Sequence, residues 1–164
     1  MLIGHFTERP YQDPESGYFG ATGLPIKDLD LSNDIYDPVV GSNLYNRYLD
    51  EKIYAEEMGF DALMLNEHHS TPFCMGGAMN VEASILARIT NKAKIVLLGN
   101  ILPIWDDPLW LVEQLAMIDM ISKGRLVSGW VRGTGRESVA HNAPPAYNWE
   151  RFPDAHVFIV KAWT

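Results

Sequence analysis

The chain has 164 residues and a net charge of −8, with 47% hydrophobic and 21% charged residues, a composition typical of a soluble globular domain. This acidic balance, without any basic run, argues against a nucleic-acid partner, because phosphate binding requires clustered Lys and Arg. The single cysteine, Cys74, excludes an internal disulfide. The N-terminus lacks the features of a signal peptide, and no apolar run approaches the roughly 18 residues of a membrane span. We therefore expect a cytoplasmic protein without a membrane partner.

Short apolar runs alternate with longer helical patterns along the chain. Strands are predicted at Leu2–Phe6, Asp61–Asn66, Lys94–Leu98 and Arg125–Val131. Helices are predicted at Asn43–Met58, Asn80–Ile89, Leu109–Ile121 and Asn148–Trp163. The segment 7–41, rich in Pro, Gly and Asp, is predicted to be a long loop that serves a site or a lid.

The helix assignments rest on apolar spacing and on capping residues. The apolar residues at helical spacing are Tyr45, Leu49 and Ile53 in the first helix, Val81, Ile85 and Ile89 in the second, and Leu111, Leu115 and Ile118, predicted to be core, in the third. Asn80 and Asp107 are predicted N-caps, the latter followed by Pro108 at the first helical position. Glu113 is predicted to be solvated or ion-paired. Pro153, about one turn into the last helix, predicts a later start or a kink.

The spacing of the strands indicates the fold class. The second, third and fourth strands begin about thirty residues apart, which is typical of a βα unit. Since no hairpin signal interrupts the series, a parallel α/β sheet is predicted. A doubly wound sheet and a TIM barrel both fit this pattern. A complete barrel needs on the order of 250 residues, so a chain of this length would supply only part of one.

Three polar residues, Glu67-His68-His69, end the second strand, where a barrel places catalytic side chains. Because side chains alternate along a strand, Glu67 and His69 would share one side and His68 would point to the other. Spacing alone does not decide which side faces the barrel axis. A solvated loop start is the alternative, and a zinc site is disfavoured because the H-E-x-x-H spacing is absent.

Two further features follow strands. Gly99-Asn100 follows the third strand, where a glycine allows the backbone to pass close to a ligand, although a plain turn also fits. The segment 132–136 after the fourth strand is Gly-rich and contains two arginines, which suits a phosphate or a charged surface loop. It departs from the dinucleotide fingerprint G-x-G-x-x-G because residue 138 is Ser and no helix is predicted to open directly after it.

Taken together, in this order and spacing, these segments resemble the luciferase-like flavin-dependent monooxygenases of the bacterial luciferase family. The matching segments are Gly59-Phe60-Asp61, Asn66-Glu67-His68-His69, Leu98-Gly99-Asn100, Leu102-Pro103, residues 113–119, Ser122-Lys123-Gly124-Arg125-Leu126 and Arg132-Gly133. The resemblance covers nearly the whole chain. It implies an α/β fold in which residues 1–164 are the N-terminal half, the first four βα units, of a (β/α)8 TIM-barrel domain.

The resemblance also implies a function and a site. Reduced FMN and O2 would oxygenate a small organic substrate, with a flavin reductase supplying the reduced FMN. His68 would act near the flavin as a base or hydrogen-bond donor. The residues that would bind the cofactor are Glu67, then Gly99 and Asn100 under the isoalloxazine, sometimes with a non-proline cis peptide, and Arg132, Gly133 and Thr134 at the phosphate.

One departure and two alternatives limit these implications. The luciferases themselves carry a cysteine where this chain has Val131, which argues against light emission. A non-catalytic flavin-binding or assembly protein, which pairs with itself as a homo-oligomer or with another chain to close the sheet, is one alternative. A deazaflavin-dependent oxidoreductase of the same superfamily, which transfers hydride, is the other.

Overall fold

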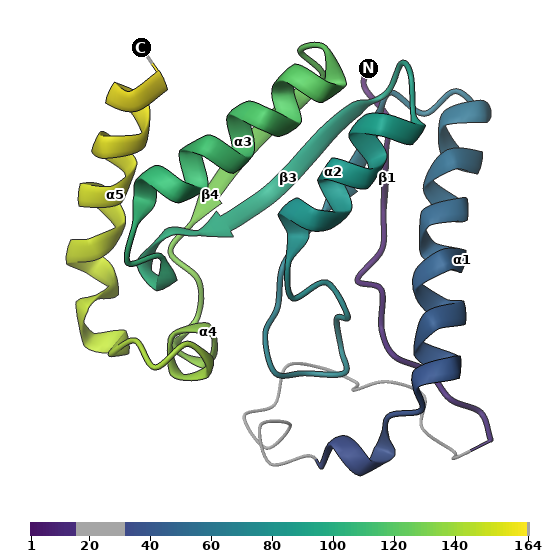
Figure 1. Ribbon diagram of the computed structural model, residues 1–164, viewed down its shortest axis with the longest axis horizontal. Helices are drawn as coiled ribbons and strands as arrows, with labels where there is room; N and C mark the ends of the chain where they lie inside the picture. Colours follow the sequence, from purple (N-terminus) through teal and green to yellow (C-terminus); the bar gives the residue numbers. More distant parts are fainter. Residues whose placement is uncertain (16–31, 164) are drawn as a thin grey trace.

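The structure is a computed structural model that describes residues 1–15 and 32–163. One sheet contains the strands β1 (Gly4–Phe6), β2 (Ala62–Leu65), β3 (Lys94–Ile101) and β4 (Leu126–Val131). All neighbouring pairs are parallel, and the spatial order β1-β2-β3-β4 is the order along the chain. The helices are α1 (Pro38–Glu57), α2 (Met79–Ile89), α3 (Pro108–Ser122), α4 (Gly135–Ala140) and α5 (Asn148–Trp163) (Figure 1). The predicted parallel α/β sheet is therefore confirmed.

Helices cover one face of this sheet. Leu63 and Leu65 of β2 are fully buried, and they belong to a core cluster that also contains residues of α2 and α3. The opposite face carries side chains that stay accessible, among them Leu98, which is 39% exposed, and Val127, which is 46% exposed. A doubly wound sheet would have both faces covered by helices, so the observed layering is that of a barrel wall.

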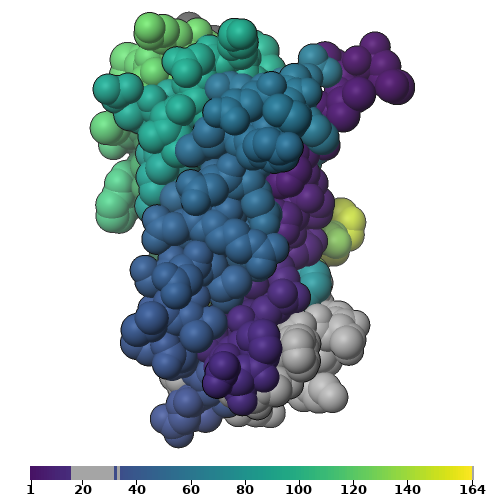
Figure 2. Space-filling view, turned by 90° about the vertical axis from the view of Figure 1, so that its right-hand side faces the viewer, coloured from purple at the N-terminus to yellow at the C-terminus, as the bar shows by residue number. Residues whose placement is uncertain are grey.

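At one edge of the sheet, β1 runs alongside α1 at the surface of the molecule (Figure 2). α1 begins five residues earlier than predicted, because Asp37 caps it and Pro38 occupies its first turn. The Asp37 carboxylate accepts hydrogen bonds from the N–H groups of Val39, at 2.7 Å, and of Val40, at 3.0 Å. Of the predicted loop over 7–41, residues 16–31 lie outside the described residues, and residues 38–41 belong to α1 instead.

The faces of the first two helices differ from the apolar spacing in the sequence. α2 exposes Val81, Ile85 and Ile89 and buries two polar residues, Asn80 and Glu82. Asn80 is not the predicted N-cap, because α2 begins at Met79 and the cap position is Ala78. The Asn80 amide instead donates to Gln114 Oε1 of α3 at 3.0 Å. In α1 the buried face is shifted by one position, to Leu44, Tyr48, Lys52 and Ala55.

Helix α3 follows the predictions more closely. α3 buries Leu111, Leu115 and Ile118 and leaves Glu113 exposed, as predicted. The Asp107 side chain caps α3 by accepting from Leu109 N at 3.0 Å. None of the helices within the described ranges is long and apolar enough to cross a membrane.

α5 spans the predicted residues and includes Pro153, so the predicted later start is wrong. Its first residue is held in place, because Asn148 Nδ2 donates to Ser138 Oγ of α4 at 2.8 Å. α4 itself begins at Gly135, so the expectation that no helix opens directly after the Gly-rich loop is also wrong. Six residues are too few to show a helical period, and contacts with the rest of the chain stabilise this helix.

Candidate active site

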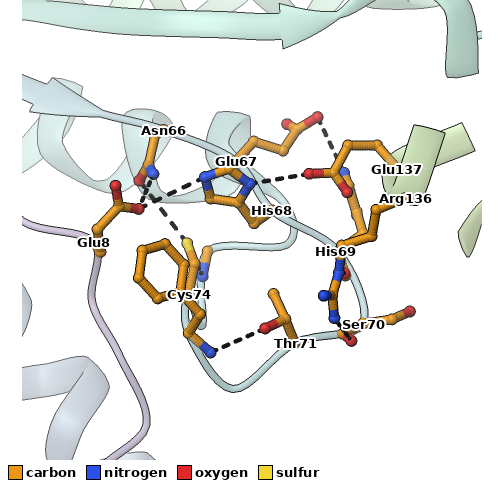
Figure 3. A network of polar contacts seen from close by, with 12 residues as sticks. Glu8, Asn66, Glu67, His68, His69, Ser70, Thr71, Cys74, Arg136 and Glu137 are labelled. Atoms are coloured by element: carbon orange, nitrogen blue, oxygen red, sulfur yellow. Dashed lines mark hydrogen bonds and ion pairs between the residues drawn. The ribbon is translucent and has the colours of Figure 1, made fainter. Parts of the chain in front are cut away.

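The carboxyl ends of the four parallel strands bring distant polar residues together. His68 lies at the centre of this group (Figure 3). Its Nδ1 lies 2.9 Å from Oε1 of Glu137, whose side chain is only 2% exposed. Its Nε2 lies 3.7 Å from Oε2 of Glu8, which follows β1. Because an ionised carboxylate only accepts hydrogen bonds, Glu137 requires the proton on Nδ1 and leaves Nε2 as the nitrogen that can accept one.

Glu8 and Asn66 hold the opposite side of the histidine. Asn66 Nδ2 donates to the Glu8 carboxylate, and the main-chain oxygen of Asn66 accepts from Arg9 Nη2 at 2.6 Å. Arg9 is fully buried and forms an ion pair with Glu82 of α2, with Nε 2.9 Å from Oε2. The loop after β1 is therefore anchored to both the sheet and α2, which fixes the position of Glu8.

Helix α4 holds the other side of the Glu-His-His loop. Besides the contact between Glu137 and His68, Arg136 Nη2 donates to Ser70 O at 2.6 Å and its Nε donates to His69 O at 3.3 Å. Ser70 has a φ of 52°, a conformation that non-glycine residues rarely adopt. The side chains of α4 therefore stabilise a loop conformation that the backbone preferences of the loop residues disfavour.

The alternation predicted for the end of β2 is present. Glu67 Oε1 lies 3.2 Å from His69 Nε2, so these two side chains lie together, while His68 contacts Glu137 and Glu8. Leu63 and Leu65 lie on the helix side of β2, and Glu67 continues that set of residues. The spacing left open which of these side chains face the barrel axis. In the structure, His68 lies on the inner side of the sheet, together with Asn66.

Several buried polar atoms at the ends of β3 and β4 and on α4 have no hydrogen-bond partner among the described residues. They are Nη1 of Arg132, both amide atoms of Asn100 and Oε2 of Glu137. Arg132 stacks on Trp149, with Cζ 3.7 Å from the ring centroid. An unpartnered buried polar atom costs about 1–3 kcal/mol, so groups of this kind point to a ligand that supplies their hydrogen bonds.

Local backbone conformation and close packing explain why glycine occupies two positions at this edge. Gly99 has a φ of 152°, and a Cβ there would lie 2.4 Å from Val131 Cγ1. Gly133 has a φ of 74°, and its Cβ would lie 2.4 Å from Ile101 Cγ2. Thr134 is exposed at the cap position of α4. All peptide bonds of the described residues are trans.

A model of the luciferase-like monooxygenase family matches residues 39–164. The chain belongs to this family. It is 36% identical over 88 residues to the alkanal monooxygenase alpha chain of Photobacterium leiognathi, a match that covers 53% of this chain and 24% of the relative. It is 34% identical over 102 residues to the oxygenase component of the flavin-dependent trigonelline monooxygenase of Acinetobacter baylyi, covering 60% of this chain and 27% of the relative.

Solved structures support the fold. The chain matches monooxygenase RslO1 from Streptomyces bottropensis with a TM-score of 0.71 and 22% identity, over 99% of this chain and 42% of that chain. It matches the oxygenating constituent of 3,6-diketocamphane monooxygenase from Pseudomonas putida, solved with FMN, with a TM-score of 0.69 and 19% identity, over 74% of this chain and 34% of that chain. The predicted fold, βα units of a TIM barrel, is therefore confirmed. The matches to the two curated relatives span about a quarter of each relative's length.

Proposed function

We propose that this chain carries the proton-transferring histidine and the phosphate anchor of an FMN-dependent monooxygenase, in which reduced FMN and O2 oxygenate a small organic substrate. The observation that carries the proposal is that His68, held by Glu137, and buried polar groups that lack partners occur at the same carboxyl edge of the sheet. This edge is where barrels of this kind place their active sites.

The unpartnered groups fit a flavin mononucleotide. The free Nη1 of Arg132 is a charged donor suited to a phosphate, and the backbone N–H groups of Gly133 and Thr134 follow it directly. The buried amide of Asn100 offers one donor and one acceptor, which suits the edge of a heterocycle that presents both. Gly99 would lie beside the same ring. Glu67, on the helix side, would support this site through the loop rather than from within it.

When bound, reduced flavin would supply the electrons that activate O2, and O2 would supply the oxygen atom, while the protein supplies position and proton transfer. His68 is the proton-transferring group, because Glu137 fixes its Nδ1–H and leaves Nε2 to accept or return a proton. Glu8, held by Asn66, stabilises the protonated ring electrostatically from 3.7 Å. The inner face of the sheet is apolar at Leu98 and Val131, and a cofactor that covered these side chains would exclude water from them and from the reacting atoms.

Partners follow from the same proposal. A flavin reductase would supply reduced FMN, and a nucleic-acid partner is not expected. A homo-oligomer is supported by the apolar residues that α3 exposes, since Trp110, Met117 and Met120 are each more than half exposed.

A hydride-transferring, deazaflavin-dependent oxidoreductase is the second candidate function. The observation that favours it is the same Nε2 of His68, since an imidazole held between two carboxylates also suits removal of a proton from an alcohol that loses hydride. The absorption spectrum of the cofactor that copurifies with the protein distinguishes the two, because flavin and deazaflavin absorb differently.

The direct test combines binding with turnover. The purified protein is titrated with FMN, then supplied with reduced FMN by a reductase in air together with aldehydes, cyclic ketones or N-methylpyridinium carboxylates. We expect FMN to bind and one substrate class to give an oxygenated product, with less hydrogen peroxide released when that substrate is present. Absence of FMN binding, or peroxide release that no substrate class reduces, would contradict the proposal.

A further inference from the structure

A cavity of about 240 Å³ lies on the helix side of the carboxyl edge of the sheet. Its polar lining comes from Glu67 and His69 after β2, Asn80 at the start of α2, Trp105 after β3, Gln114 of α3 and His141 after α4. His68, Asn100 and Arg132 do not line it. The cavity is therefore separate from the candidate active site, and the proposed flavin chemistry does not explain the polar residues that line it.

Glu67 places a buried negative charge in this cavity. Its side chain is 4% exposed, and its ion-pair partner is His69, whose Nε2 lies 3.2 Å from Oε1. His69 Nδ1 in turn lies 2.9 Å from His141 Nε2. With Glu67 ionised, His69 donates from Nε2 and accepts at Nδ1, so His141 is the donor and both rings can be neutral. Burial, and then the neighbouring His69, lower the pKa of His141 below its usual value.

Across the part of the chain that the structure describes, Glu67 forms no ion pair with a Lys or Arg. A buried carboxylate is costly unless a charge and hydrogen bonds compensate it. The cavity also contains a second acceptor, because Asn80 is 7% exposed and its Oδ1 has no partner while its Nδ2 donates to Gln114. Two buried acceptors that face one cavity favour a cationic donor.

The same cavity presents donors to an anion. Residues 77–81, the first turn of α2 and the positions before it, line the cavity. Ala78 at the cap provides no side-chain hydrogen bond. The N–H of Val81 donates to Ala78 O at 3.0 Å, so the N–H groups of Met79 and Asn80 and the positive end of the helix dipole remain available. The indole Nε1 of Trp105 is also buried without a partner. Met79 and Ile104 contribute apolar side chains to the lining of the cavity.

We propose that this cavity binds a free α-amino acid with an apolar side chain. The ammonium group would donate to Glu67 and to Asn80 Oδ1. The carboxylate would accept from the N–H groups of the first turn of α2 and from Trp105 Nε1. The side chain would lie against Met79 and Ile104. Asn80 Oδ1 and Trp105 Nε1 would gain the partners that they lack, and Glu67 would gain a compensating charge.

The test is calorimetric titration of the whole chain with three probes. L-leucine carries both charged groups, 3-methylbutylamine lacks the carboxylate, and 4-methylpentanoate lacks the ammonium. We expect L-leucine to bind and each analogue to bind at least tenfold more weakly, because charge-assisted hydrogen bonds contribute about 1.5–3 kcal/mol. Glu67→Gln should weaken L-leucine binding at least tenfold. Glu113→Gln, on the exposed face of α3 beside Gln114, is the matched control and should change nothing.

Titration of the wild-type chain with the three probes tests the proposal by itself, so the outcome does not depend on whether the Glu67→Gln variant folds. Absence of L-leucine binding, or equal binding of the three probes, overturns it. The titration is repeated with saturating FMN. Unchanged L-leucine binding supports a separate site, and competition with FMN would assign the amino acid to the flavin site and overturn the proposal. L-leucine binding without FMN binding would contradict the proposed function alone.

Discussion

Two arginines stand at opposite ends of β4, and their surroundings differ. Arg125 precedes the strand and donates five hydrogen bonds, to the main-chain oxygens of Ala87, Thr90, Ala93 and Ser122 and to the hydroxyl of Thr90. Arg132 follows the strand, stacks on Trp149 and has a buried Nη1 without a partner among the described residues. Arg125 thus joins the ends of α2 and α3 to the sheet, whereas Arg132 retains a donor for a ligand.

This difference separates two of the segments on which the resemblance to the family rests. Ser122-Lys123-Gly124-Arg125 forms a turn, in which Lys123 and Gly124 both have positive φ and Ser122 Oγ accepts from Arg125 N. It lies at the amino end of the strand, where conserved features of a barrel serve stability. Arg132 and the Glu-His-His run lie at the carboxyl end. Substitutions at the two ends should therefore change different measured quantities.

The largest expected effect is on turnover, at His68. His68→Asn keeps a donor where Nδ1–H meets Glu137 and removes the basic Nε2. In a protein with measurable oxygenation, we expect the rate to fall by a factor of roughly 10² to 10⁴, with flavin affinity and the free energy of unfolding nearly unchanged. His68→Ala should lower the rate similarly and also destabilise the fold, because it leaves the buried Glu137 carboxylate unpaired. Unchanged turnover in His68→Asn would show that His68 is structural.

Arg125 should give the largest effect on stability. Arg125→Ala leaves several buried carbonyl groups at the helix ends without a donor, so we expect the free energy of unfolding in urea to fall by more than about 3 kcal/mol. Arg88, which is exposed in the last turn of α2, provides the control. Arg88→Ala should change stability by less than about 0.5 kcal/mol. Similar losses in both variants would contradict the structural role of Arg125.

For Arg132, the expected effect is on flavin affinity. Arg132→Ala should weaken FMN binding by a factor of roughly 10 to 100, because a charge-assisted bond contributes about 1.5–3 kcal/mol. Riboflavin has no phosphate, so its affinity should hardly change. Flavin fluorescence titrations with both ligands measure this selectivity. If both affinities fell equally, Arg132 would shape the loop without contacting the phosphate.

The sequence predicted most where the signal was local. Asp107-Pro108 marked the start of α3, and the alternation at Glu67-His68-His69 placed His68 apart from its two neighbours, as the contacts show. The same Asp-Pro signal at 37–38 was missed, because it stood inside a segment whose composition predicts a loop. At 37–38, a local signal was therefore overridden by the pattern of the longer segment around it.

Contacts between distant residues could not be predicted in this way. α2 buries Asn80 and Glu82 and exposes Val81 because polar partners come from elsewhere, Gln114 from α3 and Arg9 from the loop after β1. Glu137 reaches His68 across 69 residues of sequence. Such partners are set by the three-dimensional arrangement of the strands, and hydrophobic periodicity contains no information about them.

The smallest expected effect concerns Lys52, which lies in the helix-sheet layer, away from both ends of β4. It is fully buried, and its Nζ donates to Met64 O at 2.8 Å. Burial lowers the pKa of Lys52 from 10.5 to about 8, with Glu82 opposing this shift and Arg9 adding to it. Between about pH 8 and 10.5 the unfolded chain therefore retains a proton that the folded protein releases. The free energy of unfolding must rise with pH across that window.

Urea denaturation at pH 7, 8 and 9 measures this rise, which should reach about 1 kcal/mol by pH 9. Burial raises the pKa of the Cys74 thiol, so its folded form keeps a proton that the unfolded form loses near pH 9, and this opposes the effect of Lys52. Lys52→Met retains Cys74, so the difference between the two pH profiles isolates the lysine. We expect the wild-type profile to rise relative to that of Lys52→Met. Parallel profiles would mean that Lys52 keeps its ordinary pKa in the folded protein.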